Sequence, residues 1–449
     1  MESGCVLTDG TALHVFPSRN SIEDILHTKV NATDRGDQED PFYIVNLGRL
    51  AHLYNQWSDL LPSVIPFYAV KCNYDPVILQ TLAALGAGFD CASKQEITTI
   101  LNLGVDPSRI IYANPCKQKS HIRFAAEVGV DVMTFDNEVE LYKIKNCFPT
   151  AKLVIRIMAN DPTATVKLGT KFGVESGHAP HLLSVAKSFG LDVVGVSFHV
   201  GSGAQSSSAY ANALALAKEV FVNAEKLGFT MKLLDIGGGF PGATGTESFF
   251  QEIASTVMSS LEATFGSQYK DLKVIGEPGR YFACSTHVLA VSVISKRCIS
   301  SHPNKEFMYY INDGIYGSFN CLLHGHVKPT PKILQCSTNS VATSSIVWGP
   351  TCDSIDKVNT AFLLPELNVG DWLYYEDMGA YTICAQSPFN GFSRPMAYYY
   401  CTDKESNMLR SLLGSSSTEE LITQSSLSCQ QLVQEHVNTN CLKMEVDCC

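Results

Sequence analysis

The sequence lacks the features that would direct it to a membrane, to nucleic acid or out of the cell. No apolar segment approaches the roughly 18 residues of a membrane span. No lysine- or arginine-rich stripe offers a basic surface to nucleic acid or to an anionic membrane, and the formal net charge is -11. A basic start followed by an apolar run, the mark of a secretory signal, is not found. We therefore expect a cytoplasmic protein that binds neither nucleic acid nor membranes.

Paired metal-ligand spacings are also missing. The 16 cysteines are scattered along 449 residues, and none has the paired spacing of a zinc site. Without an export signal they predict reduced thiols, mostly small core residues, and no metal site. The terminal pair Cys448-Cys449 is compatible with lipidation, although an incidental pair is the simpler interpretation.

The sequence does contain a regular alternation of short apolar runs and helix-period segments. Strand, helix, strand at this spacing predicts parallel βαβ units. Eight such units over roughly 220 residues favour a (β/α)8 barrel over the alternative, a doubly wound open sheet. The apolar runs are Pro66–Val70, Gly88–Cys91, Ile110–Ala113, Val132–Phe135, Leu153–Ile157, Val193–Val200, Leu233–Ile236 and Val274–Gly276.

The composition, 45% hydrophobic and 17% charged, is ordinary for a globular chain, and its length favours two domains. After Arg280, strand signals occur with little helical periodicity and predict a β-rich second domain. We expect an N-terminal segment over 1–45 that packs with the β-domain, the barrel over 46–283, the C-terminal β-domain over 284–400 and a tail over 401–449. The shorter elements that we expect are a helix at Ser21–Leu26, a loop at Asn31–Pro41, a strand at Phe42–Leu47 and a helix near Cys429–Val437.

The first apolar run of the alternation ends in a lysine. Pro66-Phe-Tyr-Ala-Val-Lys-Cys-Asn73 predicts a buried strand that stops at Lys71. Partial desolvation lowers the pKa of an amine, which would give Lys71 the neutral nucleophile that forms a Schiff base with a carbonyl compound. For a lone lysine, a side chain that simply reaches into water is the alternative.

Polar, ionisable or glycine residues lie at the end of every one of these runs, within the last few residues or directly after them. The loops after the strands of a barrel meet at one rim, where such folds carry their chemistry. Each of these residues alone is equally well explained as a structural polar group whose hydrogen bonds are satisfied. Together on one rim, they predict a charged pocket. They are Lys71, Asp90 with Ser93, Asn114, Asp136, Arg156, His199, Asp235 with Gly237–Gly239, and Glu277 with Arg280.

Three glycine-containing loops follow consecutive predicted strands: His199-Val-Gly-Ser-Gly203, Asp235-Ile-Gly-Gly-Gly-Phe240 and Gly276-Glu-Pro-Gly-Arg280. Glycines let backbone N–H groups approach an anion closely, and barrels often bind phosphate at the last two such loops. With Arg280 as a permanent cation, these loops predict a phosphate site. A phosphate, a lysine and an acid in one pocket indicate pyridoxal phosphate, with Glu277 at its pyridine nitrogen and His199 against its ring.

Several segments carry a specific family resemblance. They are Pro66-Phe-Tyr-Ala-Val-Lys-Cys-Asn73, Phe89-Asp-Cys-Ala-Ser93, Tyr112-Ala-Asn-Pro-Cys-Lys-Gln118, Phe198-His-Val-Gly-Ser-Gly203, Leu234-Asp-Ile-Gly-Gly-Gly-Phe-Pro-Gly242, Glu277-Pro-Gly-Arg280 and Trp348-Gly-Pro-Thr-Cys-Asp353. They resemble the eukaryotic ornithine decarboxylases of the group IV pyridoxal-phosphate decarboxylases, and are most similar to the leucine-decarboxylating paralogue. The resemblance implies an alanine-racemase-type barrel, a C-terminal β-domain and head-to-tail homodimers with active sites between subunits.

The resemblance also implies roles for single residues. Lys71 matches the Schiff-base lysine, Glu277 the partner of the pyridinium nitrogen and His199 the histidine stacked on the ring. Cys352 matches the thiol that a neighbouring subunit uses to protonate the substrate carbon, and Asp353 matches an acid that binds the distal ammonium. The other implied cofactor-binding residues are Asp90, Arg156, Ser202, Gly239, Gly279, Arg280 and Tyr381.

The chain departs from the family pattern at the substrate end. Ornithine decarboxylases have a Tyr-Asp pair shortly after Gly-Ser-Phe-Asn-Cys, whereas Gly317–Cys321 here runs into Leu322-Leu-His-Gly-His-Val-Lys-Pro329, which is shorter and has no acid. A buried ammonium with too few charged partners bears a desolvation cost. We therefore expect a neutral aliphatic substrate such as leucine, with Tyr316 and His324 beside it. Ornithine, held by Asp353 alone, is the alternative.

The family also includes antizyme inhibitors, which have lost catalysis. Their sequences break the glycine loops and the arginine of Glu-Pro-Gly-Arg, whereas this chain keeps them and Cys352. We therefore expect a working carboxy-lyase, with a non-catalytic antizyme binder as the alternative. The stretch Lys117–Lys143 matches the antizyme-binding surface of the family, with Lys119, Arg123 and Lys143 as its cations, although an ordinary exposed helix explains these charges equally well.

Overall fold

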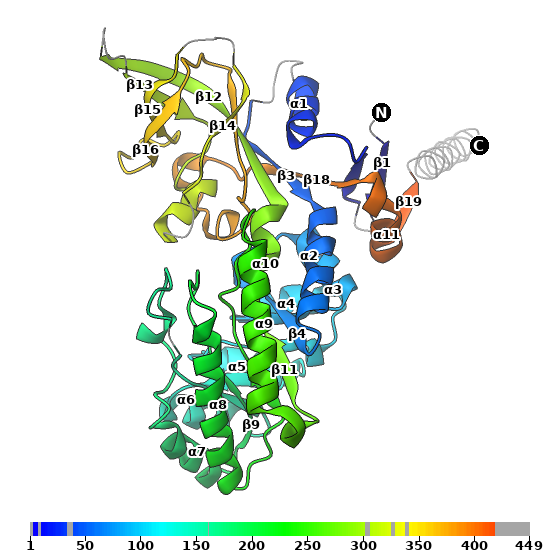
Figure 1. Cartoon of the computed structure of the whole chain (residues 1–449), viewed down its shortest axis with the longest axis vertical. Coiled ribbons are helices and arrows are strands. Elements are labelled where there is room, and N and C mark those ends of the chain that lie inside the picture. The colour runs from blue at the N-terminus through cyan, green and yellow to red at the C-terminus, as the bar shows by residue number, and fades with distance from the viewer. Residues whose placement is uncertain are drawn as a thin grey trace, which may run out of the picture.

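A closed barrel of parallel strands and a separate β-rich sheet make up the protein (Figure 1). In Figure 1 the barrel occupies the lower half of the molecule and the sheet the upper half. Among the described helices, none has the length and hydropathy that crossing a bilayer requires. The computed structural model describes residues 3–7, 10–33, 39–159, 161–300, 306–324, 328–336 and 341–417.

Each of the predicted apolar runs is a strand of the barrel. The order around the barrel is β10-β11-β4-β5-β6-β7-β8-β9, and each neighbouring pair is parallel. The predicted barrel is therefore confirmed and the doubly wound sheet is wrong. The strands are β4 (Val64–Ala69), β5 (Gly88–Cys91), β6 (Ile110–Tyr112), β7 (Val132–Phe135), β8 (Lys152–Arg156), β9 (Asp192–Ser197), β10 (Leu233–Asp235) and β11 (Lys273–Gly276).

Helices follow the barrel strands, and polar residues at the strand ends cap several of them. The carboxylate of Asp75 accepts hydrogen bonds from Val77 N and Ile78 N, and Ser93 caps the next helix through Glu96 N. Such caps satisfy N–H groups that have no partner within the helix. The helices are α3 (Pro76–Leu85), α4 (Lys94–Asn102), α5 (Lys119–Glu127), α6 (Glu138–Cys147), α7 (Ala179–Ser188), α8 (Ser208–Lys226), α9 (Glu247–Thr264) and α10 (Arg280–Ala283).

The second part is a mixed sheet that contains strands from both ends of the chain. Its order is β16-β15-β13-β12-β3-β18-β2-β1-β19, with β17 paired to β12 and β14. The strand that precedes the barrel, β3, thus lies between two strands that follow it. The strands are β1 (Ser3–Leu7), β2 (Ala12–Phe16), β3 (Phe42–Asn46), β12 (His287–Ser300), β13 (Glu306–Ile311), β14 (Lys332–Gln335), β15 (Thr343–Trp348), β16 (Lys357–Leu364), β17 (Trp372–Tyr375), β18 (Met396–Thr402) and β19 (Ser415–Ser417).

Among the described residues, three α-helices lie outside the barrel repeat: α1 (Ile22–Thr33), α2 (Leu47–Leu60) and α11 (Asp403–Leu413). Helix α1 runs beyond the predicted Ser21–Leu26 into the start of the expected loop at Asn31–Pro41. Helix α11, which begins with a capping box at Thr402 and Glu405, lies within the stretch that we expected to be a tail. The domain boundaries stay predictions. The helix expected near Cys429–Val437 and the pair Cys448-Cys449 lie outside the described residues.

A buried aromatic cluster connects α2, the helix before the first barrel strand, with α10, the helix after the last one. Trp57 of α2 is fully buried and donates from Nε1 to Val64 O at 2.8 Å, at the start of β4. Its ring packs against Tyr281 and Phe282 of α10 and against Phe250 of α9. Burial of large rings contributes strongly to packing, so this cluster fixes the helix that follows β11, where Arg280 lies.

Candidate active site

Lys71 lies in a 3-10 turn, Val70–Cys72, directly after β4. Its side chain is 43% exposed and forms an ion pair with Asp90 of β5, whose side chain is fully buried. Burial lowers the pKa of Lys71, but Asp90 and then Glu277 outweigh burial, and the net pKa lies above its ordinary value. The prediction that desolvation alone gives a low pKa is therefore wrong for the protein without a bound carbonyl compound, because two carboxylates face the amine.

The loops after the strands enclose a cavity of about 330 Å³ around Lys71. Five of the ten polar side chains predicted at the strand ends line it, and they lie at or just after the ends of β4, β6, β8, β9 and β11. Its lining residues are Lys71, Ala92, Ala113, Asn114, Pro115, Arg156, Val166, Leu168, Phe172, His199, Ser202, Glu277 and Tyr381.

Two carboxyl groups form a buried pair beneath this cavity. Asp235 and Glu277 are 1% and 8% exposed, and Asp235 accepts a hydrogen bond from Gly237 N at 2.9 Å. Burial raises the pKa of Asp235 to about 7 and raises the pKa of Glu277 well above its usual range, and Asp235 contributes to the latter. A cationic N–H placed against Glu277 would reverse this effect, which is the property required of a partner for a pyridinium nitrogen.

The buried pair predicts how stability depends on pH. A carboxyl whose pKa is raised by folding keeps its proton where the unfolded chain has lost it, so stability falls as pH rises between the two pKa values. For Asp235 these are 3.8 and about 7. We expect the urea midpoint of the cofactor-free protein to fall from pH 4.5 to pH 7, and Asp235→Asn to flatten the decline. An unchanged slope in the variant would contradict this.

His199 is held as a neutral imidazole. Its Nδ1 accepts a hydrogen bond from Gly201 N at 3.0 Å, which leaves the other ring nitrogen to carry the proton. Burial, with the nearby charges of Arg156 and Lys71, lowers the pKa of His199 well below its ordinary value. A neutral, fixed ring presents a flat face to the cavity and does not compete with Lys71 for the carboxylates.

A smaller cavity continues from the first one toward α10 and has the properties of an anion cradle. Arg280 lies there, with its side chain over the ring of Tyr381 at 5.2 Å. Its Nε, Nη1 and Nη2 are buried and have no hydrogen-bond partner in the described part of the chain. A buried guanidinium without partners is costly, so these donors fit a phosphate that enters the cradle. The predicted Ser202, Gly239 and Gly279 also line it.

The backbone of the cradle needs glycine at Gly239. Its φ of 108° is a conformation that other residues rarely adopt, and a Cβ there would lie 2.7 Å from Gly201 O and 2.8 Å from the Tyr210 hydroxyl. Tyr381 also has a positive φ, 56°, and its N–H donates to Cys72 O at 3.0 Å. Strained backbone of this kind clusters at binding sites.

The residues expected at the substrate end lie outside the cavity of Lys71 in the same chain. The Tyr316 hydroxyl donates to the carboxylate of Asp353 and lowers its pKa, while Cys352 is exposed and its N–H donates to Asn390 Oδ1 at 2.9 Å. None of these three residues is among those that line the cavity. The side chain of His324 lies outside the described residues.

One wall of the cavity was not predicted. Val166, Leu168 and Phe172 come from the long connection between β8 and α7, which has no strand or helix periodicity. Phe172 lies under the guanidinium of Arg156 at 5.3 Å. The predicted Asp136 does not face the cavity but accepts a hydrogen bond from Gly173 N at 2.9 Å, and so holds this connection in place.

The chain belongs to the family of pyridoxal-dependent decarboxylases. A model of the pyridoxal binding domain of that family matches residues 47–284. Its cofactor is pyridoxal phosphate, and the enzymes of the family are carboxy-lyases.

Individual relatives agree with this assignment. The chain is 46% identical over 398 residues to an ornithine decarboxylase of Mus pahari, which covers 86% of both chains. It is 45% identical over 393 residues to antizyme inhibitor 2 of Xenopus laevis, covering 86% of this chain and 85% of that one. The crystal structure of the Paramecium bursaria Chlorella virus arginine decarboxylase bound to agmatine has a TM-score of 0.79 at 36% identity, over 84% of this chain and 100% of that one.

Proposed function

We propose that the Lys71 cavity is the active site of an amino-acid decarboxylase that releases carbon dioxide and a primary amine. The observation that carries this proposal is the joint arrangement of Lys71 and Glu277 in one cavity beside the guanidinium of Arg280, which has no hydrogen-bond partner among the described residues. When bound, pyridoxal phosphate supplies an electron sink that allows a carboxylate to leave the α-carbon.

The residues of this chain have separate tasks in the proposal. Lys71 holds the cofactor, and Arg280 with the glycine loops binds its phosphate. Glu277 keeps the ring nitrogen protonated, because the buried carboxylate gains a cationic partner. His199 lies against the face of the ring, where its neutral state avoids a repulsive charge.

A second copy of the chain completes the site in our proposal. Cys352 and Asp353 lie outside the cavity of their own chain, which supports a homodimer in which they reach the cavity of the neighbouring subunit. Cys352 would then return a proton to the α-carbon, and Asp353 would bind the far end of the substrate.

Ornithine is the substrate that the relatives favour, since the curated proteins at 44–46% identity include ornithine decarboxylases from several organisms. The expectation of leucine finds no support in these comparisons. One observation still favours a neutral aliphatic substrate as the second candidate. The segment Leu322–Pro329 has no acid, so Asp353, already bonded to Tyr316, is the acid left for a distal ammonium at this end of the site.

Carbon dioxide release from ornithine, lysine and leucine separates the candidates. We expect the highest kcat/KM with ornithine, and we expect Asp353→Asn to raise the KM for ornithine at least about tenfold, since a charge-assisted bond contributes about 1.5–3 kcal/mol. Turnover of leucine in preference to ornithine, with a KM that Asp353→Asn leaves unchanged, would replace ornithine by the second candidate.

We propose that antizyme binds the surface formed by the stretch Lys117–Lys143. The similarity of the chain to a protein named antizyme inhibitor 2 supports this proposal. Lys119 and Arg123 are exposed on α5, and Val139 and Tyr142 of α6 are 69% and 58% exposed. Lys117 does not contribute to such a surface, because it is buried.

A further inference from the structure

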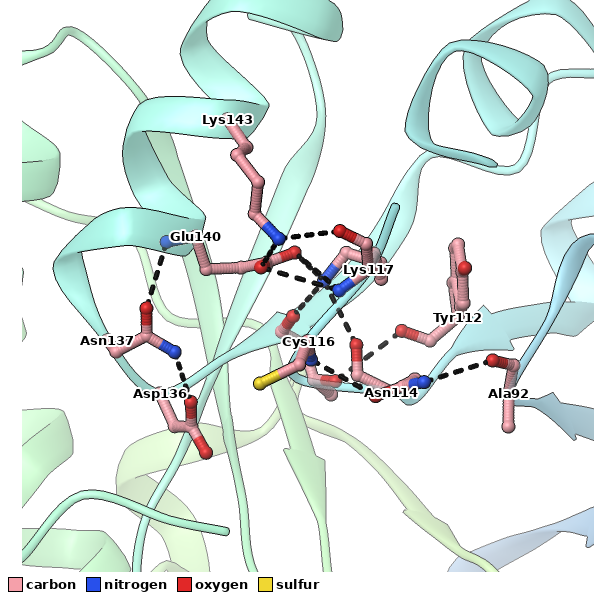
Figure 2. A network of polar contacts seen from close by, with 10 residues as sticks. Ala92, Tyr112, Asn114, Cys116, Lys117, Asp136, Asn137, Glu140 and Lys143 are labelled. Atoms are coloured by element: carbon pink, nitrogen blue, oxygen red, sulfur yellow. Dashed lines mark hydrogen bonds and ion pairs between the residues drawn. The ribbon is translucent and has the colours of Figure 1, made fainter. Parts of the chain in front are cut away.

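A buried carboxylate, that of Glu140, lies between two lysines, Lys117 and Lys143 (Figure 2). Glu140 of α6 has a side chain that is 1% exposed, and its Oε1 lies 2.9 Å from Lys117 Nζ. The Lys117 side chain is fully buried, while Lys143, which is 19% exposed, forms an ion pair with the other oxygen of Glu140. The network thus runs from the protein surface into the interior.

One arm of this network reaches the cavity through the loop after β6. Lys117 Nζ donates to Asn114 O at 3.1 Å and to Thr134 O at 2.6 Å, so it joins this loop to β7. The Asn114 side chain donates to Ala92 O at 3.2 Å (Figure 2). Ala92, Asn114 and Pro115 all line the cavity, and the network therefore holds this part of its wall.

A second arm starts at the backbone of Glu140 and reaches the connection between β8 and α7, which forms another part of the wall. Asn137 Oδ1 accepts a hydrogen bond from Glu140 N at 3.0 Å, and Asn137 Nδ2 donates to Asp136 Oδ1 at 2.7 Å (Figure 2). The other oxygen of Asp136 holds Gly173 N, which follows the wall residue Phe172. Ala92, Asn114, Pro115 and Phe172 line the larger cavity but not the cradle of Arg280. Both arms therefore end away from the phosphate.

Stability alone does not account for this arrangement. A buried ion pair is often no more stable than apolar residues of the same shape, although removal of one partner is strongly destabilising. The charges add a geometric constraint, because the ammonium of Lys117 binds two backbone carbonyls at once, one in the loop after β6 and one in β7.

We propose that Glu140 and Lys117 are positioning residues, which set the wall of the cavity on the side away from the phosphate and so determine how the substrate amino acid fits. The inference rests on the proposed function of the cavity. Neither residue is among those lining the cavity. Lys117 acts on the wall through its bond to Asn114 O, next to Pro115, and Glu140 acts by holding Lys117.

The double variant Lys117→Met with Glu140→Leu separates positioning from stability. Each single variant leaves a buried charge with fewer partners and should lower the melting temperature, whereas the double variant should recover most of the loss. We expect the double variant to bind pyridoxal phosphate as the wild type does. Its KM for the amino acid should nevertheless be raised about tenfold, because the carbonyls of Asn114 and Thr134 lose their donor and the wall shifts.

A control variant and a second measurement distinguish a shifted cavity wall from a general loss of stability or activity. Lys145→Met, which removes an exposed lysine from the same helix, should change neither KM nor melting temperature. The dissociation constant of the amino acid, read from the change in cofactor absorbance, does not depend on turnover. A double variant with wild-type affinity in this measurement would overturn the inference, whereas an inactive wild type would refute only the proposed function.

Discussion

Lys71→Ala should lose the visible absorbance of covalently held cofactor and release carbon dioxide at least about a thousandfold more slowly. The physical reason is the position of the amine. Within the described residues, Lys71 is the lysine that lines both the larger cavity and the cradle of Arg280. No neighbouring amine is available there to replace it. The measurements are an absorbance spectrum and a carbon dioxide release assay on the same preparation.

Two further variants give this expectation its controls. Lys71→Arg keeps a cation beside Asp90 but has no amine that forms a Schiff base, so it should be as inactive as Lys71→Ala while retaining more stability. Lys94→Ala, on the exposed face of α4, should leave both spectrum and activity unchanged. If Lys71→Ala kept the coloured cofactor, the assignment of the anchoring residue would be wrong.

Arg280→Met should weaken binding of pyridoxal phosphate at least about a hundredfold, because it removes a cation and two or more charge-assisted hydrogen bonds of about 1.5–3 kcal/mol each. The same substitution should not lower the melting temperature of the cofactor-free protein. Its three buried nitrogens have no hydrogen-bond partner in the described chain, so a residue of similar length removes a buried charge whose hydrogen bonds are unmade and loses only the contact with the ring of Tyr381.

A titration of cofactor-free protein with pyridoxal phosphate, followed by absorbance, measures the first effect, and a thermal melt measures the second. Arg280→Lys should be intermediate, since it keeps the charge without the planar fork. Arg123→Met, an exposed position on α5, is the matched control. A melting temperature that drops sharply in cofactor-free Arg280→Met would show that Arg280 supports the fold instead of a ligand.

The barrel was predictable because its strands are buried on both faces. Such strands are short apolar runs, and the helices between them have a different period, so the alternation is visible without any long-range information. The candidate site followed from the same pattern. Parallel strands end on one rim, and Lys71, Arg156, His199 and Glu277 lie at or just after the ends of apolar runs, which is sufficient to group them in one cavity.

The β-rich sheet was harder to predict because its strands depend on partners far away in the sequence. Strands β1 and β2 pair with each other, but β2 also pairs with β18 and β1 with β19, so each has one neighbour from the far C-terminal part of the chain. Strand β16 is likewise half exposed and mixes polar with apolar residues. In such segments packing against neighbours, not local preference, decides the conformation.

The charge and the contacts of single side chains could not be predicted from the sequence for a related reason. The pKa of Lys71 depends on Asp90 and Glu277, which lie on other strands, and their charges reverse the effect of burial. The link from Lys143 through Glu140 and Lys117 to Asn114 O also joins helix α6 to the loop after β6.

By itself, the sequence determined the barrel, the rim on which the chemistry lies and the residue types placed there, because period and strand ends are local properties. Tertiary structure alone decided which of those residues share a cavity, which hold the wall behind it and what charge they carry. The reason is that electrostatic interactions and hydrogen bonds depend on distances in space, and the fold brings together groups that are far apart along the chain.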